Sequence, residues 1–176
     1  MNSVSGMDRR FGRVLDKLRA DGRLDDTVLF FFGDNGRLEA RGIHWCYDNG
    51  LRVPLVVRWP KNFAAPERYQ AGKVVTDLLS LLDVTATTLF VAGVERPLPM
   101  CGHRFLGPET LPPRRYVFAA RDRLDETLQR IRSTHDARYH YIRTFSTGPT
   151  FASLNRYKEK CFPVLPLMRD MHGAAS

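Results

Sequence analysis

Apolar residues near the start of the chain recur at steps of three and four positions. They are Val4, Met7, Phe11, Val14, Leu15 and Leu18, with charged residues between them. This spacing predicts an amphipathic helix that ends near Asp21-Gly22. The strand predicted next, Thr27 to Phe32, is almost entirely apolar. A helix followed by such a strand suggests a crossover that feeds a sheet covered on both faces.

The middle of the chain predicts a second strand, a second helix and two irregular segments. Leu55 to Trp59 is the strand, and a long loop precedes it. Residues 75–90 present leucines on one helical face, with Asp83 able to cap a helix and Gly93 able to end it. Residues 94–113 are punctuated by proline and glycine and predict a connector.

The last third of the chain predicts a small antiparallel sheet. Residues 116–120 form a short apolar run, and residues 128–133 and 138–145 flank His135-Asp136-Ala137. Residues 139–143 alternate with a period of two, which predicts a hairpin. Three successive strands without helices between them are typical of antiparallel pairing. A short helix is expected at residues 165–172. The sequence therefore predicts an α/β protein whose C-terminal part is a small antiparallel sheet, distinct from the crossover architecture of the first half.

Composition narrows the choice of partners. The chain has 176 residues and a net charge of +8, and arginine is its main basic residue. The arginine fork suits sulfate, carboxylate or phosphate, although surface arginines from a biased base composition explain the same count. The arginines are spread along the chain, which argues against nucleic acid. There is no membrane-spanning run and no signal peptide, and the localisation and oligomeric state stay open. The three cysteines fit reduced thiols.

Candidate chemistry lies at the end of the first predicted strand. Phe32 leads into Gly33-Asp34-Asn35-Gly36. Ligands of open α/β sheets bind at strand ends, and carboxylate and amide oxygens suit a hard cation. Asp-Asn-Gly is also a favourable turn sequence, so these residues alone predict either a binding site or a simple turn.

Longer motifs resemble a known family. Phe32 to Gly36, Arg41-Gly42 and Tyr47 to Pro60 resemble, in order, the central signature of the type I, formylglycine-dependent sulfatases of the alkaline-phosphatase-like superfamily. Tyr116 to Thr127, followed by Arg138 to Arg143, resembles the C-terminal sheet of a bacterial branch close to sulfamidases and heparan-type sulfatases.

The resemblance implies a fold and a reaction. Residues 1–113 would be part of the α/β catalytic domain, and residues 114–176 a small antiparallel-sheet C-terminal subdomain with a terminal helix. A formylglycine hydrate would attack sulfur while Ca²⁺ and basic side chains neutralise the sulfate oxygens. Asp34 and Asn35 would be the second pair of calcium ligands. The substrate would be a sulfate ester or sulfamate, on a glycan or a small molecule.

The sequence departs from the family pattern in two places. The Cys/Ser-x-Pro-Ser/Ala-x-Arg motif that yields formylglycine is absent, and Cys161-Phe162-Pro163 imitates only its first three positions. Ile43 stands where the family carries a basic residue that contacts sulfate. His44 or Arg41 could supply that charge, or His44 could simply pack on Trp45.

The resemblance also implies that the family's first helix begins before Met1. The chain is therefore expected to be the C-terminal portion of a sulfatase that lacks turnover alone. Charged residues of the C-terminal sheet could bind the sugar part of a substrate or could form a salt-bridged turn. They are Arg121, Asp122, Asp125, Glu126 and His135.

Two alternatives to a sulfatase stay open. One is a catalytically inactive sulfatase-like binding or scaffold protein, or a non-functional gene fragment, which the absent nucleophile and Ile43 favour. The other is a zinc phosphoesterase of the same superfamily. Zinc prefers imidazole or thiolate ligands, and the lack of paired Asp-His ligands counts against this reading.

Overall fold

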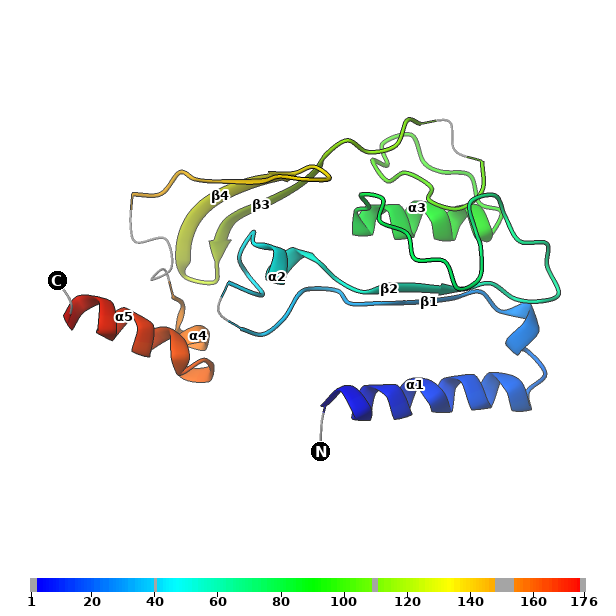
Figure 1. Ribbon diagram of the computed structural model, residues 1–176, viewed down its shortest axis with the longest axis horizontal. Helices are drawn as coiled ribbons and strands as arrows, with labels where there is room; N and C mark the ends of the chain where they lie inside the picture. The colour runs from blue at the N-terminus through cyan, green and yellow to red at the C-terminus, as the bar shows by residue number, and fades with distance from the viewer. Residues whose placement is uncertain (1–2, 40, 109–110, 148–153, 175–176) are drawn as a thin grey trace.

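The computed structural model describes residues 3–39, 41–108, 111–147 and 154–174. Its helices and strands, in chain order, are α1 (Ser3–Ala20), the 3-10 helix η1 (Leu24–Asp26), β1 (Leu29–Phe32), α2 (Asp48–Leu51), β2 (Leu55–Arg58), α3 (Leu81–Val91), β3 (Val117–Leu124), β4 (Thr127–His135), β5 (His140–Thr144), α4 (Arg156–Cys161) and α5 (Val164–Ala174). Figure 1 shows β1 and β2 between α1 and α3, with the second sheet beyond α2. Within the described ranges no helix is both long and apolar enough to cross a membrane.

The first sheet consists of β1 and β2, which pair antiparallel with Leu29 opposite Arg58. Phe31 packs on Phe11 of α1 with ring centroids 4.9 Å apart, and Phe30 packs on Phe105 at 6.3 Å. Successive side chains of a strand point to opposite faces, so both faces of β1 are packed, as predicted. The long loop between β1 and β2 lets the chain reverse direction and return along β1. The crossover predicted from α1 into the sheet stays a prediction.

Helix α3 is shorter than predicted. It begins at Leu81 because Ser80 and Asp83 form a capping box, in which Oδ2 of Asp83 accepts a hydrogen bond of 2.8 Å from the Ser80 backbone N–H. The predicted helix over residues 75–80 is therefore wrong. The helix stops at Gly93 as predicted, since this glycine has the left-handed φ of 69° that favours it after a helix. The described part of the connector, 94–108 and 111–113, has no regular structure.

The second sheet has the order β3-β4-β5, with both neighbouring pairs antiparallel. This confirms the predicted hairpin and the three successive strands. Strand β3 continues to Leu124 and passes a bulge between Arg121 and Arg123, whereas the sequence predicted an end at Ala120. Helix α5 confirms the predicted C-terminal helix, and α4 was not predicted.

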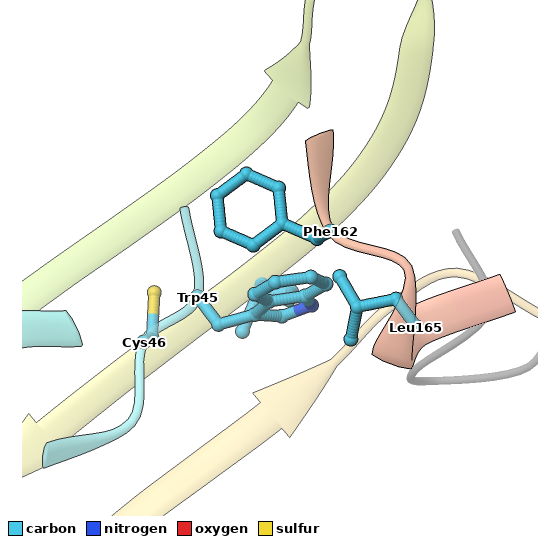
Figure 2. Packing of buried hydrophobic residues seen from close by; sticks show 5 residues of the cluster. Trp45, Cys46, Phe162 and Leu165 are labelled. Atoms are coloured by element: carbon cyan, nitrogen blue, oxygen red, sulfur yellow. The ribbon is translucent and has the colours of Figure 1, made fainter. Parts of the chain in front are cut away.

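The main hydrophobic core lies where the loop before β2 meets the second sheet and the C-terminal segment. It consists of Trp45, Cys46, Ile131, Phe162 and Leu165. Figure 2 shows Phe162 and Leu165 against the Trp45 indole. This core joins residues from both sides of the predicted domain boundary after residue 113, and the boundary itself stays a prediction.

Candidate functional site

The loop that carries Asp34 and Asn35 is held by its own backbone. The Gly36 N–H donates to Gly50 O at 3.1 Å, so the start and the end of the loop lie against each other. A Cβ at Gly36 would come within 1.9 Å of the Asn49 carbonyl oxygen, so a glycine is required here. These contacts continue the β1–β2 pairing and fix Asp34 and Asn35 at the end of β1.

Both side chains at this strand end are exposed. Among the described residues neither Asp34 nor Asn35 has a hydrogen-bond or ion-pair partner. A carboxylate and an amide oxygen are the donors that Ca²⁺ prefers, and Ca²⁺ takes six to eight such ligands. The two residues therefore fit part of a calcium site, and their assignment as ligands stays a proposal.

The segment after them has an unusual backbone. Arg41 and His44 have left-handed φ values of 60° and 79°. The Arg41 guanidinium lies over the Tyr47 ring, 5.4 Å from its centroid. Burial, with smaller effects from Lys158 and Arg121, lowers the pKa of His44 below its usual 6.5. This shift disfavours the charged form of His44, which weakens its case as a replacement for a basic side chain at position 43 and leaves Arg41 as the other residue proposed for that role.

Two buried cations bind the backbone of this segment. Lys158 Nζ donates to Ile43 O at 3.0 Å, and Arg121 Nη1 donates to His44 O at 2.9 Å. Lys158 is fully buried and Arg121 is 7% exposed. Both flank the Trp45 ring, at 4.7 Å and 5.5 Å from its centroid. Sequence reasoning missed Lys158, because nothing in its local pattern sets it apart from the neighbouring lysine.

Arg121 thus supports the loop from a buried position. The charged residues of the turn between β3 and β4 also have partners within the chain. Asp122 pairs with Arg132 at 2.7 Å. Asp125 accepts a hydrogen bond from Asn155 Nδ2. Glu126 Oε1 accepts one of 2.7 Å from the Arg156 backbone N–H, which lowers the pKa of Glu126. These contacts match the salt-bridged-turn alternative.

His135 lies at the other end of β4 from this turn. At roughly 3.3 Å per residue, the strand separates the two ends by about 26 Å. The five candidate sugar-binding residues therefore do not line one pocket, and their role in substrate binding stays a prediction. His135 instead faces His140 across the hairpin, with ring centroids 5.1 Å apart.

Comparison with known proteins places these features in a family. The profile of the Sulfatase family matches residues 1–94. The chain is 32% identical over 170 residues to an ulvan-active sulfatase of Formosa agariphila, covering 97% of this chain and 27% of that protein. It is 31% identical to an N-acetylglucosamine-6-O-sulfatase of Bacteroides thetaiotaomicron, covering 57% of this chain and 18% of that protein. It is 39% identical to human N-sulphoglucosamine sulphohydrolase, covering 49% of this chain and 16% of that protein.

A solved structure shares the fold. The structure of BT4656 in complex with its substrate D-glucosamine-2-N,6-O-disulfate matches with a TM-score of 0.63 and 20% identity, covering 97% of this chain and 39% of that chain. The fold is that of the alkaline-phosphatase-like α/β proteins. Within that class, the chain belongs to the Sulfatase family, as the sequence motifs predicted. It spans about a quarter of the length of the ulvan-active relative.

Proposed function

We propose that this chain is the C-terminal portion of a hydrolase of sulfate esters or sulfamates, and that it supplies half of a calcium site. The observation that supports this most is the end of β1 in a Sulfatase-family chain, where Asp34 and Asn35 are exposed and have no partner among the described residues. The substrate would be a sulfated sugar, since the relatives are named for ulvan, N-acetylglucosamine and N-sulphoglucosamine.

The residues of this chain would have distinct roles in that reaction. Asp34 and Asn35 would hold the calcium ion, which when bound acts as a Lewis acid toward sulfate oxygens. Arg41 would bring a permanent positive charge to the same loop. The 176 residues contain no formylglycine motif. The nucleophile must therefore come from residues outside this sequence, and the chain alone should release no sulfate.

The test is a chimera that places the N-terminal part of the ulvan-active sulfatase before this chain. It should release sulfate from a sulfated glycan when calcium is supplied. Asp34→Ala should lower kcat/KM by about 100-fold or more, because it removes a ligand of the charge-stabilising ion. Asp16→Ala is the matched control, since Asp16 is an exposed acid of α1 that pairs with the nearby Arg19 at 2.6 Å.

Ile43 favours a second candidate function, a binding protein without turnover, because isoleucine offers no charge to sulfate. The chimera separates the two candidates when it is assayed with and without Ile43→Lys. Sulfate release by either version supports the hydrolase. If neither version releases sulfate, while calorimetry shows that sulfated oligosaccharide still binds in the presence of calcium, the chain belongs to a binding protein.

A further inference from the structure

We propose that Asp48, His135 and His140 form a second metal site, which takes a divalent transition metal such as Zn²⁺. One ligand atom from each of the three side chains lies within 4.8 Å of the other two. The three residues come from the start of α2 and from the facing ends of β4 and β5. The proposal is independent of the sulfatase reaction, since it involves neither Asp34 nor Asn35.

The two histidines are held in place by the hairpin. His135 and His140 are directly opposite each other in the antiparallel β4–β5 pairing, so their side chains stand on the same face. The turn between them is braced by Asp136. Its backbone N–H donates to Tyr139 O at 2.9 Å, and its Oδ1 accepts hydrogen bonds from the backbone N–H groups of Arg138 and Tyr139 at 2.7 and 2.6 Å. The two imidazoles are therefore positioned before any ion arrives.

An unsatisfied nitrogen points to a ligand. Nε2 of His140 is buried and has no hydrogen-bond partner among the described residues. Buried polar atoms are nearly always paired, and an unpaired one calls for an ion or a water. An imidazole nitrogen is a common ligand of zinc, so a divalent transition metal would satisfy this atom.

The carboxylate of Asp48 completes the donor set. Its charged neighbour is Arg52, at 4.0 Å, and both side chains are largely exposed, so this ion pair is weak. Two imidazoles and one carboxylate, with a fourth position for water, match a zinc set. Asp34 and Asn35 offer oxygen alone, which selects calcium instead. A zinc ion would thus tie α2, which directly follows the candidate calcium loop, to the C-terminal sheet.

Calorimetric titration of the full chain with ZnCl₂, in excess calcium and a reducing agent, tests the proposal. One Zn²⁺ should bind per chain, and Co²⁺ should bind competitively with the visible absorption of a low-symmetry four-coordinate site. His135→Ala and His140→Ala should each weaken zinc binding about 10- to 100-fold. His103→Ala is the matched control, because His103 lies in the connector after α3, outside the cluster.

Two outcomes overturn the proposal. One is no zinc binding at micromolar concentrations. The other is zinc binding that survives both histidine substitutions, which would assign the ion to other donors such as the exposed thiols of Cys101 and Cys161. Asp48→Asn covers a failure of the histidine variants to fold, since this exposed change keeps both rings and removes only the charged ligand. It too should weaken zinc binding, and unchanged affinity contradicts the site.

Discussion

Lys158 gives a direct test of how the C-terminal segment supports the candidate loop. Its Nζ lies 3.0 Å from Ile43 O and 4.2 Å from the Phe162 ring centroid, in a fully buried position. Burial, followed by the charge of Arg121, lowers the pKa of Lys158 from 10.5 to about 8. Folding therefore disfavours the charged form of this lysine.

The lowered pKa of Lys158 fixes the sign of a pH effect. Between pH 8 and 10.5 the unfolded chain binds more protons than the folded chain, so the free energy of unfolding must rise with pH. The whole difference in pKa corresponds to about 3 kcal/mol, and about 2 kcal/mol of it falls between roughly pH 7 and pH 9.5. Below about pH 8 the charged lysine lowers stability by nearly the full amount.

Lys158→Met should remove this pH effect, because methionine fills a similar volume and does not titrate. Urea unfolding, followed by tryptophan fluorescence near pH 7 and pH 9.5, measures it. The wild-type chain should gain about 2 kcal/mol more than the variant over this range. The other ionisable groups are common to both proteins, so the difference between the two gains reports on Lys158. Lys160→Met, an exposed change in the same helix, should behave as wild type. Equal gains in wild type and Lys158→Met would refute the reasoning.

Two further substitutions test the packing of the fold, both by urea unfolding. Asp83→Asn should lower the free energy of unfolding by about 3–5 kcal/mol, because it removes the charge of a fully buried carboxylate that pairs with the mostly buried Arg114. Burial alone would raise the pKa of Asp83, but hydrogen bonds lower it below 3.8. Wild-type stability should therefore fall as the pH drops below about 4, and the fall should be smaller in the variant. Ile131→Ala, at a position 2% exposed, should cost about 2–5 kcal/mol. Leu128→Ala, on the same strand but 72% exposed, should cost about 0.5 kcal/mol or less, and similar costs at both positions would contradict the core described above.

The elements that the sequence predicted well are those with a strong local signal. Helix α1 has a full apolar stripe, and the strand after the turn at Asp136 has a period of two. The helix over residues 75–80 was wrong because leucine spacing does not locate an N-terminus, which the Ser80–Asp83 capping box does. Helices α2 and α4 have only four and six residues. Such short helices are marginal alone and depend on tertiary contacts, which a local pattern does not contain.

The same distinction applies to the candidate site. Asp34 and Asn35 could be named as candidates from the sequence because one continuous motif carries both of them. The hydrogen bonds to the loop from Lys158 and Arg121 join residues 115 and 77 positions apart in the chain. The cluster of Asp48, His135 and His140 likewise depends on how α2 meets the hairpin. No spacing rule predicts such contacts, because they depend on how separate elements pack.

The positive charges around the loop explain why an apolar residue fits at position 43, where Ile43 stands. Two buried cations, Lys158 and Arg121, already contact the backbone at residues 43 and 44. Burial, followed by the charges of these two residues, lowers the pKa of His44. A basic side chain at position 43 would add a positive charge to a segment where burial already disfavours charge. An apolar residue avoids that repulsion, while Arg41 on its exposed side keeps a cation on the loop. In the chimera, Ile43→Lys should therefore lower stability even where it raises sulfate release.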